Sequence, residues 1–161
     1  MLTSMKTLGI ISDTHGLLRP EAVTALQGST LIIHAGDVGA TDVLSRLRDI
    51  APTIAVRGNV DDEPWARGLP LSKTVDFEGF AIHVVHRISD LDEAAIARAQ
   101  VSAVIFGHSH QPLIETRDGV LFLNPGAAGP RRFNLPITLA RITVVDGVLH
   151  PELITLCDAR V

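Results

Sequence analysis

The stretch TLGIISDTHG, residues 7–16, decides the fold class. Its first part, Thr7 to Ser12, is a short apolar run, which indicates a buried β-strand. Its second part, Asp13-Thr14-His15-Gly16, has the composition of a turn and follows the strand directly. In open α/β sheets, ligands bind outside the carboxyl ends of the strands. An acid and an imidazole at the end of a buried strand therefore favour an α/β protein with chemistry at that edge.

The same pattern of a buried strand and a polar turn occurs twice more in the first half of the chain. Two further strands are predicted, Thr30–Ala35 stopped by Gly36-Asp37 and Thr53–Val56 stopped by Gly58-Asn59. Helical spacing of apolar residues predicts helices between these strands. They cover Arg19–Gln27, with Pro20 in the first turn and Gly28 at the end, and the stretch from Thr41, as N-cap, to about Asp49.

The second half is richer in strands and tight turns. Strands are predicted at Leu71–Phe77, Phe80–His86, Val101–Phe106, Leu113–Thr116, Val120–Leu123, Ile137–Val145 and Val148–Leu156. Hairpin turns are expected at Glu78-Gly79, Asp118-Gly119 and Asp146-Gly147, and an Ala-rich helix over Ser89–Gln100, with Ser89 as N-cap. Alternation followed by hairpins predicts an α/β fold, a four-layer αββα sandwich of two mixed β-sheets flanked by helices. We expect one domain over residues 1–161.

Composition narrows the class of protein. Of the 161 residues 46% are hydrophobic, which is ordinary for a globular domain, and the net charge of −4 predicts no general affinity for nucleic acid or anionic membranes. No apolar run approaches the roughly 18 residues that a membrane span needs. The start of the chain, Met1 to Thr7, does not read as a signal peptide, and the single Cys157 favours a reducing compartment. We therefore expect a cytoplasmic protein.

Residues that can bind metal follow the predicted strands. They are Asp13, His15, Asp37, Asn59, His86, His108 and His110. The spacing of two within Asp13/His15 and within His108/His110 would put both side chains of a pair on one side of an extended chain. Oxygen and imidazole ligands without thiolate suit Mn, Fe, Zn, Ni or Mg. Seven ligands exceed the need of one ion, so Asp37 could bridge two ions about 3.5–4 Å apart.

Taken in order, these blocks resemble the signature of the calcineurin-like metallophosphoesterases. The blocks are Asp13-Thr14-His15, Gly36-Asp37, Gly58-Asn59, the strand ending in His86, and Gly107-His108-Ser109-His110. Asn59-Val60-Asp61 and Asn124-Pro125-Gly126 look most like the small phosphodiesterase branch of that family. This branch includes bacterial and archaeal enzymes and the retromer scaffold subunit. The resemblance covers about Leu8 to Val145.

The resemblance implies two divalent cations and a division of the ligands between them. One ion would be held by Asp13, His15, Asp37 and His110, and the other by Asp37, Asn59, His86 and His108. Manganese is the first expectation, with nickel, zinc, iron or magnesium as alternatives. The sequence departs from the family at Arg87, where the family usually has Gly, and at Ala127, where it usually has Ser. Both departures bear on substrate preference.

The predicted function is phosphoester hydrolysis, and by resemblance phosphodiester hydrolysis, through in-line attack of a metal-bridging hydroxide. The candidate catalytic residues are Asp37, Asn59 and His108, and the candidate substrate-binding residues are Arg87, Arg131 and Arg132. Arg131 and Arg132 could equally be a solvated basic pair. The alternatives are a phosphomonoesterase or pyrophosphatase, or a non-catalytic metal-binding scaffold of the same fold. The expected partner is a small phosphoester substrate, and a homo-oligomer is possible.

Other polar residues receive a structural interpretation. His34, His83 and His150 are expected to be strand histidines and not metal ligands, although His34 could support a ligand from behind. Asp61 and Asp62 could be a solvated acidic pair. Many relatives place a His directly after the Asn of the Gly-Asn block, where it can protonate a leaving group, but here that position is Val60. The sequence therefore predicts a site without an evident proton donor.

Overall fold

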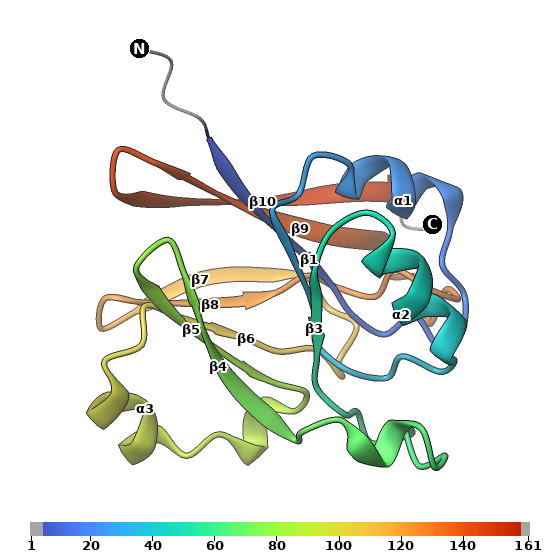
Figure 1. The fold of residues 1–161 in the computed structure, drawn as a ribbon, viewed down its shortest axis with the longest axis horizontal. Helices are drawn as coiled ribbons and strands as arrows, with labels where there is room; N and C mark the ends of the chain where they lie inside the picture. The colour runs from blue at the N-terminus through green and yellow to red at the C-terminus, as the bar shows by residue number, and fades with distance from the viewer. Residues whose placement is uncertain (1–4, 159–161) are drawn as a thin grey trace.

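The computed structural model describes residues 5–158, so both ends of the predicted domain, 1–4 and 159–161, lie outside the described residues. The described chain forms two five-stranded sheets that pack face to face, with helices on the outer faces (Figure 1). The predicted αββα sandwich of two mixed sheets is therefore confirmed. Within the described part of the chain, no helix is both long and apolar enough to span a membrane.

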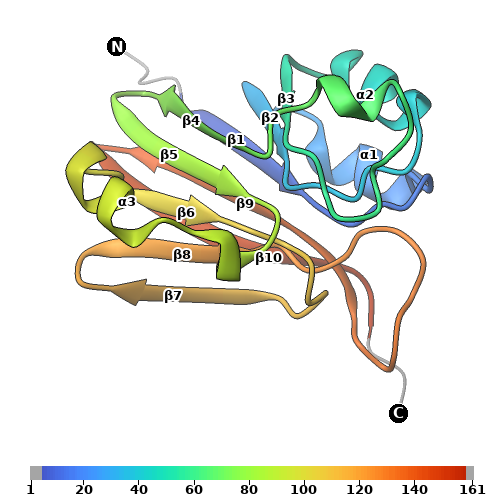
Figure 2. The ribbon, with the colours of Figure 1, turned by 90° about the horizontal axis from the view of Figure 1, so that it is seen from below.

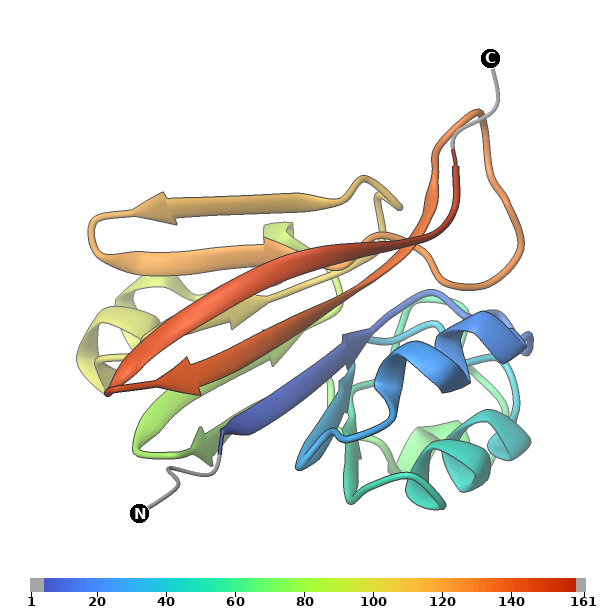
Figure 3. The same cartoon turned by 90° about the horizontal axis from the view of Figure 1, so that it is seen from above.

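The first sheet has the strand order β10-β9-β1-β2-β3. Its parallel part is β1 (Lys6–Ile11), β2 (Leu31–His34) and β3 (Thr53–Ala55), connected by α1 (Pro20–Leu26) and α2 (Thr41–Arg48). The long hairpin of β9 (Ile137–Val145) and β10 (Val148–Cys157) joins antiparallel to β1. Figure 3 shows this hairpin running beside β1, with both helices next to the parallel strands. The carboxyl ends of the three parallel strands thus meet at one edge.

The second sheet has the order β4-β5-β6-β8-β7, with β5, β6 and β8 parallel. Its strands are β4 (Ser72–Phe77), β5 (Phe80–Val85), β6 (Ala103–Ile105), β7 (Leu113–Arg117) and β8 (Val120–Asn124). The 3₁₀-helix η1 (Ala66–Gly68) precedes β4, and η2 (Ile88–Asp90) and α3 (Glu93–Ala99) connect β5 to β6. Figure 2 shows α3 against this sheet, on the side away from α1 and α2. The predicted hairpin turns are confirmed, because both residues of each turn have positive φ.

The main apolar core lies between the two sheets. It combines fully buried side chains of the first sheet, such as Leu8 and Ile33, with those of the second, such as Ile82 and Ile105. A second cluster packs α1 and α2 against the outer face of the first sheet, and a third lies beneath α3. Burial of this apolar surface is the main favourable contribution to folding. The sheet pairing that it fixes brings the carboxyl ends of β1, β2, β3, β5 and β6 to one region.

Two predicted helix starts are wrong. Thr41 is the first residue of α2 and not its cap, because the extended Ala40 takes the N-cap position. Ser89 lies inside the short helix η2, and α3 begins only after Asp92, whose side chain accepts a hydrogen bond from the Ala95 N–H. The extended Leu91 between η2 and α3 packs on the apolar cluster beneath α3. Tertiary packing therefore broke a helix that local composition favoured.

Candidate metal centre

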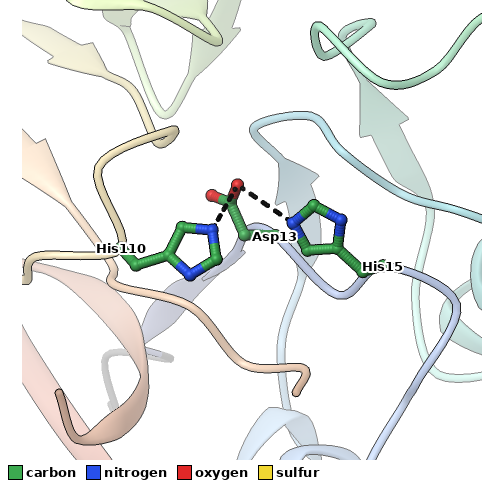
Figure 4. Close-up of side chains that lie close together, drawn as sticks. All are labelled: Asp13, His15 and His110. Carbon is green, nitrogen blue, oxygen red and sulfur yellow. Dashed lines mark ion pairs between the residues drawn. The ribbon is translucent and has the colours of Figure 1, made fainter. Parts of the chain in front are cut away.

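Three predicted ligands from distant parts of the chain form one group. Asp13 and His15 follow β1, and His110 follows β6; each offers a ligand atom, and these atoms all lie within 4.8 Å of one another. The Asp13 Oδ1 atom is 3.3 Å from His110 Nε2 and 3.7 Å from His15 Nε2. Figure 4 shows both imidazoles turned toward this carboxylate. The sequence separation of nearly one hundred residues is closed by the packing of the two sheets.

Three more predicted ligands form a second group, from Asp37, His86 and His108. The His86 Nε2 atom lies 3.2 Å from Asp37 Oδ2. The side-chain oxygen of Asn59 lies 2.9 Å from His86 Nε2 and 2.9 Å from His108 Nδ1. The structure therefore brings all seven predicted residues together, Asn59 included.

Asp37 lies between the two groups. Its Oδ2 atom is 3.2 Å from His86 Nε2 in the second group and 3.7 Å from His15 Nε2 beside Asp13. Its other oxygen, Oδ1, accepts a hydrogen bond of 3.0 Å from the Val60 N–H, which fixes the carboxylate orientation. A carboxylate in this place can contribute to both groups, as a bridging ligand must.

Unsatisfied polar atoms test whether cations fit this site. Among the described residues, three buried side-chain atoms have no hydrogen-bond partner, namely Asp13 Oδ1, His15 Nε2 and His110 Nδ1. An unsatisfied buried polar group costs about 1–3 kcal/mol. Asp13 Oδ1 and His15 Nε2 lie 3.7 Å apart, and a divalent cation is a partner that an anionic oxygen and an imidazole nitrogen can share. The donor set therefore fits a metal.

The tautomer of His86 points the same way. Its Nδ1–H donates a hydrogen bond of 2.8 Å to the Ala35 carbonyl, so the neutral ring presents a lone pair at Nε2. That nitrogen nevertheless faces two oxygens, one from Asn59 and one from Asp37. Three acceptors converge, and a cation, a second proton on His86 or a rotated Asn59 amide would each provide the missing partner.

Charge in the site follows from burial and from these neighbours. Burial alone would raise the pKa of Asp13, but its contacts with His110 and His15 outweigh this effect and hold that pKa well below its usual value. Burial likewise opposes ionisation of Asp37, yet the contact with His86 lowers its pKa. For His86, burial lowers the pKa, but the contacts with Asp37 and Asp13 raise it by more, so the net shift of the pKa is upward. Both carboxylates are ionised, and a metal must displace protons from imidazole.

The backbone at the site is in a rare conformation. Five of the seven predicted ligands have positive φ, namely Asp13 (53°), His15 (45°), Asp37 (55°), His108 (71°) and His110 (63°). The predicted extended geometry for Asp13/His15 and His108/His110 is therefore wrong, and His108 and His110 lie in different groups. Asp and His tolerate this region better than most residues, but it is strained. Such strain concentrates at functional sites.

Glycines beside the ligands make room for ligand side chains. A Cβ on Gly107 would stand 2.6 Å from Asp13 Oδ2, and one on Gly36 would stand 2.6 Å from His86 Nδ1. The structure assigns them to the packing of the ligands themselves, because any side chain there would displace a carboxylate or an imidazole.

His34 supports the site from behind. It is fully buried, its Nδ1 accepts from the Gly36 N–H at 3.1 Å, and its Nε2–H faces Thr14 Oγ1 at 2.9 Å. The Thr14 hydroxyl in turn donates to the Val38 carbonyl at 2.8 Å. This chain of hydrogen bonds requires a neutral ring with its proton on Nε2, and it ties the turn after β1 to the turn after β2.

The burial of His34 predicts a loss of stability in acid. Burial lowers its pKa to about 4, from 6.5. Because the unfolded chain takes up the proton first, the stabilisation is present above pH 6.5 and is lost as the pH falls toward 4, by about 3 kcal/mol for a shift of this size. The raised pKa of His86 affects the free energy of unfolding above pH 6.5 instead, where its stabilising contribution is lost as the pH rises.

Urea unfolding of metal-stripped protein at several pH values measures this effect. His34→Asn should flatten the profile between pH 6.5 and 4, while His150→Gln, on the exposed hairpin strand β10, should keep the wild-type slope. A wild-type profile that is flat in this interval would contradict the assignment.

The other two histidines lie outside both groups. The His83 ring is 2.8 Å from Thr74 Oγ1 on the neighbouring strand β4, and burial lowers its pKa. His150 lies on β10 opposite Thr143 of β9. That neither binds metal stays a prediction, and metal content after His83→Gln or His150→Gln would test it.

Asp61 is not part of a solvated pair. It is buried, whereas Asp62 is exposed. Its Oδ2 accepts from the N–H groups of Gly58 (2.9 Å) and Val38 (3.1 Å), and its Oδ1 from that of Gly39 (3.2 Å). Its position two residues after the predicted ligand Asn59 is a sequence signal that could have suggested a role in holding the ligand turns. Asp61 connects the turn after β3 to the turn after β2, and both of its carboxylate oxygens accept backbone N–H groups.

The three predicted substrate-binding arginines have different surroundings. Arg87 lines a cavity of about 380 Å³ together with Asn59 and His86. Arg131 closes its own loop, because its Nη1 donates to the Leu135 carbonyl at 2.8 Å, and Arg132 is exposed. No contact of either with a predicted ligand occurs among the described residues, so their role stays a prediction. The same cavity is lined by Arg57, which the sequence analysis missed.

Comparison with known proteins places these features in a family. Residues 5–147 match the model of the calcineurin-like phosphoesterase superfamily domain. The chain is 32% identical over 151 residues to a protein of Methanothermobacter thermautotrophicus named as a probable metallophosphoesterase, covering 87% of this chain and 86% of that one. It is 32% identical over 138 residues to a phosphodiesterase of Methanocaldococcus jannaschii, covering 74% of this chain and 82% of that one.

Solved structures share the fold. An archaeal phosphodiesterase superposes with a TM-score of 0.75 at 24% identity, covering 92% of this chain and 99% of that one. Wild-type Vps29 of Entamoeba histolytica, complexed with Zn²⁺, superposes with a TM-score of 0.69 at 22% identity, covering 93% of this chain and 99% of that one. At these identities the likeness shows the architecture alone.

Proposed function

Because this chain belongs to the calcineurin-like phosphoesterase superfamily, we propose that it is a phosphodiesterase with a dinuclear metal centre. The observation that carries the proposal is the pair of ligand groups that share the Asp37 carboxylate between them. A single cation would leave one group unused. Two divalent cations suit a set of two carboxylates, one amide and four imidazoles.

Asp13, His15, Asp37 and His110 would hold one cation, and Asp37, Asn59, His86 and His108 the other. When bound, such cations polarise phosphate oxygens and lower the pKa of a nearby water. The backbone of the chain orients the carboxylates that would bind these cations. Val60 N–H and His108 N–H fix the Asp37 and Asp13 carboxylates, at 3.0 and 3.1 Å. Asn59 lines the cavity, and His108 Nδ1 lies 2.9 Å from the Asn59 side-chain oxygen. Both side chains can hydrogen-bond a developing charge on the phosphate.

The choice of diesters rests on similarity to a relative named as a phosphodiesterase. It is supported by the open cavity beside the second group, which offers space for a second ester arm.

A substrate panel tests the proposal. Metal-stripped protein is refilled with Mn²⁺, Ni²⁺, Zn²⁺, Fe²⁺ or Mg²⁺ and assayed on matched p-nitrophenyl phosphodiesters, the monoester and pyrophosphate. We expect kcat/KM to be highest on a diester with at least one metal, and no turnover in the stripped protein. Faster turnover of the monoester or of pyrophosphate would overturn the diester assignment. Bound metal without turnover of any compound would favour a non-catalytic scaffold.

A further inference from the structure

The cavity beside the second ligand group has a net positive wall outside the ligands themselves. Its volume is about 380 Å³, and it extends from Asn59 and His86 to the ends of β4 and β5. Two guanidiniums, those of Arg57 and Arg87, and the carboxylate of Asp90 contribute to its wall. The scissile phosphate would already be neutralised by the metal centre, so these arginines have charge to spare for another group.

Arg57 is the uncompensated cation of this wall. It directly precedes the Gly58-Asn59 turn, and its backbone N–H donates to the Pro70 carbonyl at 2.8 Å, which fixes its position. Its side chain is half-buried, and among the described residues it has no hydrogen-bond or ion-pair partner. Its guanidinium nitrogens are not among the buried atoms without a partner, so an anion can reach them from solvent, and Arg offers a bidentate donor geometry to phosphate.

Arg87 is a second cation, held by a weak partner. Its Nε donates to Asp90 Oδ2 at 3.0 Å, and the two side chains are 47% and 53% exposed. An exposed ion pair of this kind contributes little, so an arriving anion with better geometry can replace the carboxylate. Asp90 thereby makes the Arg87 position selective for strongly anionic groups, because a weakly anionic group would not displace the carboxylate.

The rest of the wall is not charged. Leu71 and Val85 line the same cavity, and Leu71 is 62% exposed despite its apolar side chain. Apolar surface in a cavity that also contains metal ligands and two guanidiniums suits a sugar or base that connects two phosphates. The wall therefore combines metal ligands, apolar side chains and cations.

We propose, on the premise that the protein hydrolyses phosphodiesters, that this cavity binds a second phosphate of the substrate, with Arg57 as the specificity-determining residue and Arg87 as its helper. The substrate class is then a phosphodiester of a nucleotide that bears a further phosphate on the nucleoside arm. Arg57 binds the second phosphate directly and does not touch the reacting phosphorus.

Two matched substrates test this proposal. Thymidine 5′-(p-nitrophenyl phosphate) and its 3′-phosphorylated form have the same leaving group and differ by one phosphate. We expect wild-type protein to favour the 3′-phosphorylated form in kcat/KM by about tenfold or more. Arg57→Met should remove most of this preference, while kcat/KM on the simpler substrate changes by less than about threefold. Arg57→Lys should keep part of the preference, and Asp90→Asn should increase it by freeing Arg87.

Arg48→Met is the control for lost net charge, since Arg48 ends the exposed face of α2, away from the cavity lining. It should leave the preference unchanged. Equal kcat/KM for both substrates in the wild type, or an equal loss on both in Arg57→Met, would overturn the proposal while the diesterase assignment stands.

Binding provides a readout that does not depend on turnover. By calorimetry on metal-loaded protein, thymidine 3′,5′-bisphosphate should bind about tenfold tighter than thymidine 5′-monophosphate, and Arg57→Met should abolish the difference. If neither substrate is turned over but this difference is present, the proposed activity fails and the phosphate subsite stands. Equal affinities would refute the subsite.

Discussion

Asp37→Asn is expected to lose at least one bound metal per chain and nearly all phosphodiesterase activity, by about three orders of magnitude or more in kcat. The Asp37 Oδ2 atom lies 3.2 Å from His86 Nε2 and 3.7 Å from His15 Nε2, so one charge serves both ligand groups. The amide keeps the shape and can still accept the Val60 N–H, but it carries no charge. The variant should therefore fold normally but bind metal poorly.

Elemental analysis, circular dichroism and thermal unfolding measure this effect together. Saturating Mn²⁺ stabilises wild-type protein by mass action, by about 2.7 kcal/mol at one hundred times the dissociation constant. The variant should gain much less. Asp42→Asn, an equal loss of charge on the exposed first turn of α2, is the control and should behave as wild type. A full complement of two metals in Asp37→Asn would contradict the bridging role.

The second large effect concerns the leaving group. We expect kcat to fall steeply as the leaving-group pKa rises across a series of phosphodiesters, once chemistry is shown to be rate-limiting. Val60 is 48% exposed and offers only its backbone N–H, which already donates to Asp37. Asp61 accepts three backbone N–H groups. A positioned general acid typically contributes 10²–10⁴-fold. Among the described residues that line the cavity, the only acidic side chain is Asp90, which pairs with Arg87, and the only imidazole is the predicted metal ligand His86.

A substitution sharpens this test. Val60→His places an imidazole at an exposed position next to Asn59 and should raise kcat on alkyl esters more than on aryl esters, which flattens the dependence. Val60→Gln introduces a polar side chain that cannot donate a proton as an acid, and it should leave the steep dependence of kcat on leaving-group pKa in place. A flat dependence in the wild type would mean that a proton donor exists, and His108 would be the first residue to substitute.

Much of this architecture could be predicted from residues 7–16 outward. Apolar runs that end in glycine or a turn identify strands and the ligands after them, because both signals are local. All seven predicted ligands converge for that reason. The pairing of β9 with β1, across more than one hundred residues, has no local signal and depends on the packing of two sheets.

Errors arose where tertiary contacts outweigh local preference. No residue near Asp13 or His108 in the sequence indicates a left-handed backbone at these positions, and the surrounding turns hold that conformation. The expectation of an extended geometry was therefore wrong. Asp61 looked like a solvated acid because its three N–H partners come from turns that only the fold brings together. Arg57 was missed since a lone Arg before a glycine carries no signal until a cavity is seen beside it.

The most direct test of the central claim is a titration of metal-stripped protein with Mn²⁺ at protein concentrations well above the dissociation constants, followed by diesterase activity and bound metal in the same samples. The account predicts that activity rises to its maximum as the second equivalent per chain binds, with little activity at one equivalent. Full activity at one equivalent, or activity in the stripped protein, would contradict a dinuclear metal centre.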